Sequence, residues 1–134
     1  QDVNDICTVQ TTGQIFEMIR ALAEKNQKKA LDLYYDLLSL KEPPMRILFL
    51  IARQFNQLLL VKSLAAKGYD KAAIASRAKI APFVAGRCMA QARSFTTDQL
   101  KTAVQDCVQA EEDVKTGKIT DTLSVELLIM KYSK

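Results

Sequence analysis

The sequence predicts an all-α protein, a bundle of about six to eight helices around a long central helix. The run from Pro44 to Lys62 is apolar on nearly every side of a helix, and such a helix must be enclosed by others. The chain has only 4 glycines and 3 prolines, too few for the many tight turns of a sandwich or barrel. Elsewhere, apolar residues recur every three or four positions, which is the period of an amphipathic helix.

The segment before the central helix predicts two helices. Pro43 ends the second of them, because the residue before a proline disfavours helical geometry, and Pro44 can open the central helix at its first turn. In order, we expect a helical turn at residues 2–6, a polar connector at 8–11, an N-cap at Thr12 and helices over 15–26 and 30–40.

Glycines and capping residues predict where the central helix ends and where the later helices begin and end. Gly68 stands where a left-handed C-terminal cap is needed, and Asp70 can begin the next helix. In order, we expect the central helix to end near residue 66, a short helix at 74–78, a turn at 80–82, a helix over 83–95, a cap at Thr96 or Thr97, a helix over 100–114 that Gly117 ends, and a last helix over 123–132.

Size and composition predict one soluble domain, residues 1–134. Arg53, Gln54, Asn56 and Gln57 interrupt the apolar run before the ~20 residues that a bilayer requires. The sequence starts at Gln1 and shows no export signal or lipid-anchor motif, so we expect an excised domain.

Nothing in the sequence assembles a catalytic site. The chain has no His, which removes the usual neutral-pH general base and the commonest zinc ligand. Cys7, Cys88 and Cys107 are widely spread, and we interpret them as small buried apolar residues. We therefore expect no catalytic residues, no metal and no cofactor. The formal net charge of +4 permits, but does not indicate, contact with nucleic acid.

Two features suggest contacts with other proteins. The last helix is more apolar than one buried face requires, and Leu127, Met130 and Tyr132 are the candidate interface residues. Arg53 lies within the apolar central helix, where a buried unpaired charge would cost several kcal/mol. The sequence leaves two interpretations open for Arg53, either a bonded arginine at a subunit or domain contact, or a place in water on one polar stripe with Arg46, Gln57 and Lys62.

A helix-turn-helix DNA-binding regulator is the alternative function. Residues 74–80 followed by 83–93 match its outline, and the second helix would offer Arg87, Gln91 and Arg93 to the bases. Ile80 and Pro82 occupy the turn, where such units often have glycine.

Several segments, taken in order, resemble the C-terminal helical domain of the bacterial DNA polymerase III delta subunit, a component of the clamp loader. Each segment consists of common helix-forming residues, and the resemblance depends on their succession over essentially the whole chain. Its main carriers are Ile15-Phe16, Lys29-Ala-Leu31, the stretch Ile47 to Phe55, Pro82-Phe83, Gln91-Ala-Arg93, Lys115-Thr-Gly117 and Leu127-Leu128.

This resemblance implies a collar domain. The parent chain would carry N-terminal modules of a degenerate AAA+ type, which contact the sliding clamp without hydrolysing ATP. The C-terminal domain would join the other clamp-loader subunits in a collar and so support loading of the clamp onto primed DNA in replication. It would meet DNA only through the assembled complex, in the cytoplasm and away from membranes. Arg53, Leu127, Met130 and Tyr132 would then be contact residues.

Overall fold

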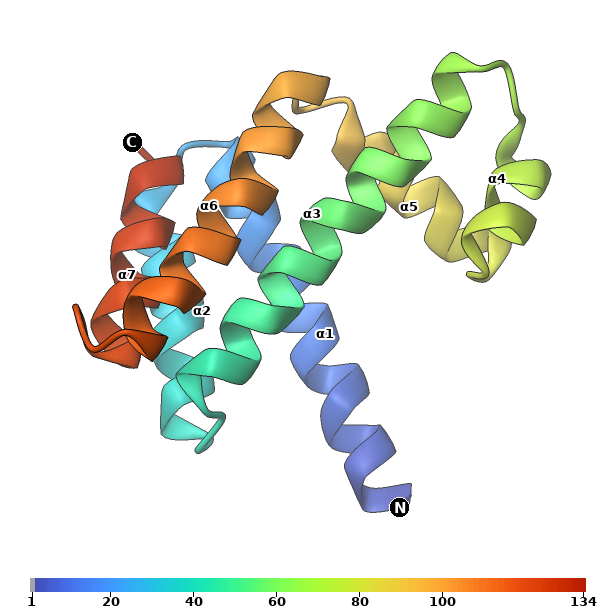
Figure 1. Cartoon of the computed structure of the whole chain (residues 1–134). Helices are drawn as coiled ribbons and strands as arrows, with labels where there is room; N and C mark the ends of the chain where they lie inside the picture. The colour runs from blue at the N-terminus through green and yellow to red at the C-terminus, as the bar shows by residue number, and fades with distance from the viewer. Residues whose placement is uncertain (1) are drawn as a thin grey trace. The chain divides into compact units, whose positions relative to one another are not determined.

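The computed structural model describes the backbone of residues 2–134 and the side chains of residues 11–134. Within these residues it is all-α, with seven helices and no strand, which confirms the predicted fold class (Figure 1). The helices are α1 (Asp2–Ala23), α2 (Gln27–Ser39), α3 (Pro44–Ala66), α4 (Lys71–Ala78), α5 (Pro82–Ala92), α6 (Thr97–Lys115) and α7 (Asp121–Tyr132).

Most helix ends fall where local chemistry predicts them. Pro44 opens α3, and Gly68 follows its end with a φ of +93°. Asp70 caps α4 by accepting a hydrogen bond from the Ala73 amide at 2.9 Å. Thr96 and Gln99 form a capping box at the start of α6. The Thr96 hydroxyl accepts from the Gln99 backbone amide at 3.0 Å, and the Gln99 side-chain oxygen accepts from the Thr96 backbone amide at 2.8 Å. Gly117 follows α6 with a φ of +79°.

The predicted N-terminal connector is wrong. Helix α1 runs without a break from Asp2 to Ala23, so residues 8–11 are helical and Thr12 is not an N-cap. The segment holds no proline, and Gly13 costs a helix only about 1 kcal/mol, which the tertiary packing of α1 outweighs. Asn26, predicted near the end of this helix, instead caps α2 by accepting from the Lys29 amide at 3.2 Å.

The packing divides the chain into two compact units, and their bounds fall inside α3 and α6. Unit 1 comprises residues 1–52 and 106–134, and unit 2 comprises residues 53–105. In unit 1, α1 packs on α2, and both contact α7. Tyr34 of α2 is completely buried there and donates from its hydroxyl to the Thr122 carbonyl at 2.7 Å.

Unit 2 is built around the second half of α3. Phe55 is buried and meets Phe95 edge to face, with ring centroids 5.9 Å apart. Helices α4 and α5 pack against each other. Polar side chains of α3 bond to α5: Gln54 donates to the Gln91 side chain at 3.0 Å, and Gln57 to the Cys88 sulfur at 3.5 Å.

Helix α3 is not enclosed on all sides. Among the described residues it is the one helix long and apolar enough to cross a membrane, yet half of that apolar stretch is buried, as in a core helix. Ile47, Ile51 and Leu58 are buried, whereas Phe49 and Leu60 are 61% and 44% exposed. The prediction of an enclosed helix is therefore wrong along one side.

Candidate interaction surface

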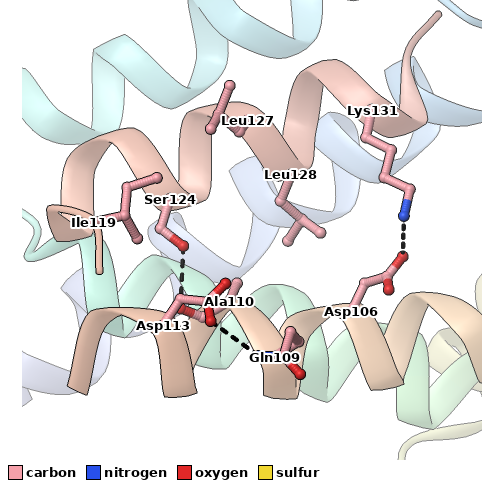
Figure 2. Close-up of a pocket in the computed structure, with 9 residues that line it drawn as sticks. All are labelled: Asp106, Gln109, Ala110, Asp113, Ile119, Ser124, Leu127, Leu128 and Lys131. Atoms are coloured by element: carbon pink, nitrogen blue, oxygen red, sulfur yellow. Dashed lines mark hydrogen bonds and ion pairs between the residues drawn. The ribbon is translucent and has the colours of Figure 1, made fainter. Parts of the chain in front are cut away.

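An open groove of about 200 Å³ lies between α6 and α7 in unit 1 (Figure 2). Two interactions hold its walls together: Ser124 donates from its hydroxyl to the Ala110 carbonyl at 3.1 Å, and Lys131 binds Asp106 at 2.9 Å. The lining is Asp106, Gln109, Ala110, Asp113, Ile119, Ser124, Leu127, Leu128 and Lys131.

The rim of this groove carries an exposed apolar stripe on α7. Leu123, Leu127 and Met130 are spaced at i, i+4 and i+7, so they share one face of the helix. Leu123 is 44% and Leu127 47% exposed, and Met130 is half-buried. Figure 2 shows Leu127 pointing away from α6, whereas Leu128 points toward it. We call these three residues the α7 stripe.

Sequence reasoning selected two of the three residues and missed Leu123. Its spacing to Leu127 and Met130 was visible in the sequence. The sequence did not show which side of the helix faces the core. The burial of Val125 and Ile129 identifies that side.

Tyr132 lies on a different side of α7 from the stripe. It follows Met130 by two positions, which is a rotation of about 200° around the helix. Its hydroxyl donates to the Asp106 carboxylate, which also accepts from Lys131. Burial and the bond to Asp106 raise the pKa of Tyr132 above the usual range. Tyr132 therefore joins α7 to α6, and only part of its ring is open to a partner.

Asp106 is the acceptor on which this cluster depends. Burial disfavours its charged form, but hydrogen bonds from Tyr132 and Lys131 outweigh that effect and lower its pKa. Asp106 and Tyr132 are 26 positions apart in the chain, so no local pattern could have paired them.

Arg53, the fourth predicted contact residue, is exposed on α3. Arg46 is exposed as well, but Gln57 and Lys62 are half-buried and bonded to α5. The structure therefore favours the interpretation in which Arg53 lies in water. Arg46 shares that exposure, whereas Gln57 and Lys62 do not. An exposed guanidinium remains open to a partner.

The proposed DNA-reading helix does not present all of its predicted residues. Arg87 and Arg93 are exposed on α5 and just after it, but Gln91 is 7% exposed and bonded to Gln54. A buried amide cannot contact base edges, which argues against a helix-turn-helix reader. Phe83 was expected to pack in the same helix and is 66% exposed.

The cysteines and acids assemble no further site among residues 11–134. Cys88 and Cys107 are each 2% exposed, as predicted, and the Cys7 side chain lies outside the described residues. Burial raises the pKa of the Cys107 thiol to about 12. In the same part of the chain, no three His, Cys, Asp or Glu side chains gather as metal ligands.

The fold and this surface define a class, an all-helical domain with an exposed apolar stripe on its last helix. The comparisons with known proteins identify the family. The family model for the DNA polymerase III delta subunit, C-terminal domain, matches residues 12–132, and the chain belongs to this family, which confirms the resemblance.

Two relatives from Bacillus subtilis agree. The chain is 32% identical over 133 residues to DNA polymerase III subunit delta of strain 168, with 99% of the chain and 38% of that protein covered. The solved Bacillus subtilis DNA clamp loader delta protein (YqeN) matches with a TM-score of 0.87 and 32% identity, over 92% of this chain and 36% of that one. The chain thus spans less than two-fifths of either relative.

Proposed function

We propose that this chain is the collar domain of a clamp loader delta subunit. It would assemble with the other clamp-loader subunits and so support loading of the sliding clamp onto primed DNA. The observation that carries the proposal is the family match over residues 12–132, together with the fold likeness to the Bacillus subtilis clamp loader delta protein. Residues 1–134 would act as one module composed of both units.

In this proposal the domain has no catalytic role of its own, and neither has the delta subunit. The N-terminal modules of a longer parent chain would contact the clamp, and the complex would work in the cytoplasm. The match to little more than a third of each relative supports a longer parent.

The α7 stripe is our proposed contact with a neighbouring subunit. Leu123 and Leu127 are large apolar residues exposed at adjacent turns of one helix, and neighbouring exposed apolar residues are typical of protein-interaction sites. The ring of Tyr132 and the exposed Arg53 complete the set of candidate contact residues. The collar assignment and the stripe are separate proposals, because another face could serve the same collar.

The test is to mix the chain with the other loader subunits in size-exclusion chromatography. Leu127→Asp should weaken co-elution, because an unpaired carboxylate in an apolar contact costs at least ~3 kcal/mol, about a hundredfold in affinity. Leu40→Asp is the matched control, since Leu40 is 57% exposed at the end of α2, outside the α7 stripe. Both surface changes should leave stability within about 0.5 kcal/mol.

The outcomes separate the two proposals. Wild-type chain that joins no loader subunit contradicts the collar assignment. Wild-type chain that co-elutes while Leu127→Asp binds equally well contradicts the α7 stripe and leaves the collar assignment standing.

A further inference from the structure

Two carboxylates border the α7 stripe, one on each side. Glu126 follows Leu123 by three positions and precedes Met130 by four, so it neighbours both on the surface of α7. Asp113 of α6 lines the groove between α6 and α7 together with Leu127. Figure 2 shows Asp113 on α6, across the groove from α7. The exposed apolar surface of α7 therefore runs between two acidic side chains, which we call the acidic flanks.

Neither carboxylate is neutralised within the described part of the chain. Asp113 accepts from the neutral Gln109 side chain at 2.9 Å. Glu126 lies beside Tyr35 of α2, whose pKa is raised by burial and then by a hydrogen bond and the negative charge of Glu126. None of the ion pairs among residues 11–134 includes Asp113 or Glu126.

The one cation that lines the groove is already used. The ammonium of Lys131 binds the Asp106 carboxylate at 2.9 Å. These two opposite charges balance each other, and the charge that remains in the lining is that of Asp113. Residues 106–134 as a whole contain six Asp and Glu against four Lys, a formal charge of −2. The surroundings of the stripe are therefore acidic.

Apolar surface lies between the acidic flanks. Leu123 and Leu127 are 44% and 47% exposed, and Ile119, Leu127 and Leu128 line a groove of about 200 Å³. A groove of this kind can receive an apolar side chain from a partner.

The half-burial of the acidic flanks determines what such a partner must carry. Asp113 and Glu126 are both half-buried, so a protein that covers the stripe removes more of their water. Desolvating a carboxylate without supplying a counter-charge is costly. A purely apolar partner would incur this cost, and an acidic partner or a nucleic acid would add repulsion. Only a partner with cations at these positions avoids both penalties.

We propose that the α7 stripe and its groove bind a segment of a neighbouring clamp-loader subunit in which an apolar side chain is flanked by Lys or Arg. The apolar side chain enters the groove, and the cations pair with Asp113 and Glu126. This inference rests on the proposed function, because it specifies the chemistry of the partner at the α7 stripe.

The test is fluorescence anisotropy of the labelled 134-residue chain, titrated with the other clamp-loader subunits. Asp113→Lys/Glu126→Lys should bind roughly tenfold or more weakly at ~0.1 M salt, because like charges then face each other. At ~1 M salt the Debye length falls to about 3 Å, so this loss should shrink while wild-type chain still binds through the stripe. The nearly isosteric Asp113→Asn/Glu126→Gln should bind roughly threefold or more weakly at ~0.1 M salt.

The matched control is Asp36→Lys/Glu112→Lys. Both residues are exposed in unit 1 and lie outside the groove lining, and their reversal changes the net charge by the same amount. The control should bind like wild type. Thermal unfolding by circular dichroism checks that every variant folds, and the neutral variant carries the test if the reversed one does not.

The outcomes separate this inference from the proposed function. Wild-type chain that binds no loader subunit contradicts both. Wild-type chain that binds while the reversed and neutral variants bind equally well overturns the acidic flanks alone, as does tighter binding by the reversed variant. An equal loss in the control would mean that net charge alone matters, which also overturns the inference. Wild-type chain that sediments as a dimer, with the reversed variant a monomer, would assign the surface to a second copy of this chain instead.

Discussion

Replacing Tyr132 by Phe isolates the hydrogen bond that joins α7 to α6. The change removes one hydroxyl that donates to the ionised Asp106 carboxylate. Hydrogen bonds to charged groups contribute about 1.5–3 kcal/mol. We expect the low end, about 1.5 kcal/mol, because Asp106 keeps Lys131 at 2.9 Å and its side chain is 26% exposed to water. For a domain of this size, the melting temperature should fall by roughly 3–6 °C.

The cost of Tyr132→Phe should depend on pH. The folded-state pKa of Asp106 is lowered, so its contribution is present above the unfolded pKa of about 3.9 and is lost as pH falls through the lowered value. Urea unfolding followed by circular dichroism, in steps from neutral pH down through the acid range, measures this loss. Tyr69→Phe is the control, since Arg77 contacts the Tyr69 ring face at 4.3 Å from its centroid and the variant keeps that ring. A cost that does not shrink as the pH falls, or that equals the cost of the control at neutral pH, would refute the reasoning.

Two further predictions concern buried groups of unit 1. Tyr34→Phe should cost about 1 kcal/mol in urea unfolding, because the completely buried hydroxyl donates to the Thr122 carbonyl; a cost no larger than that of Tyr69→Phe would contradict this. Cys107 should resist thiol reagents in the folded chain, because its pKa of about 12 against the ordinary 9.0 leaves roughly a thousandfold less thiolate at pH ~8. Mass spectrometry of the labelled peptides should find Cys107 modified after unfolding in urea, and rapid labelling of the folded chain would disprove its burial.

Features that depend on a few adjacent residues were predictable from the sequence. Pro44, Gly68, Asp70 and Thr96 all act where expected, because a cap or a left-handed turn involves only neighbours along the chain. The error in α1 also came from local reasoning. Residues 8–11 are polar or β-branched, but such residues weaken a helix by only a few tenths of a kcal/mol each and do not end it.

Features that depend on which side of a helix is covered were not predictable. Phe83 and Val108 continue apolar patterns, yet they are 66% and 61% exposed. Periodicity identifies an apolar face but does not show whether another element packs on it. The candidate interface shows the same limit. Leu127 and Tyr132 were both selected from the sequence as contact residues, and only the packing of α7 shows that the Tyr132 hydroxyl turns toward Asp106.

Contact through the α7 stripe would bury Leu123 and Leu127 and so depend on the hydrophobic effect, which salt strengthens slightly or leaves unchanged. Co-elution that depends on this stripe should therefore persist as the salt concentration rises. A contact made mainly by an exposed charge such as Arg53 would weaken instead, because salt screens exposed charges. Repeating the size-exclusion experiment across a salt series therefore distinguishes an apolar contact from a charged one.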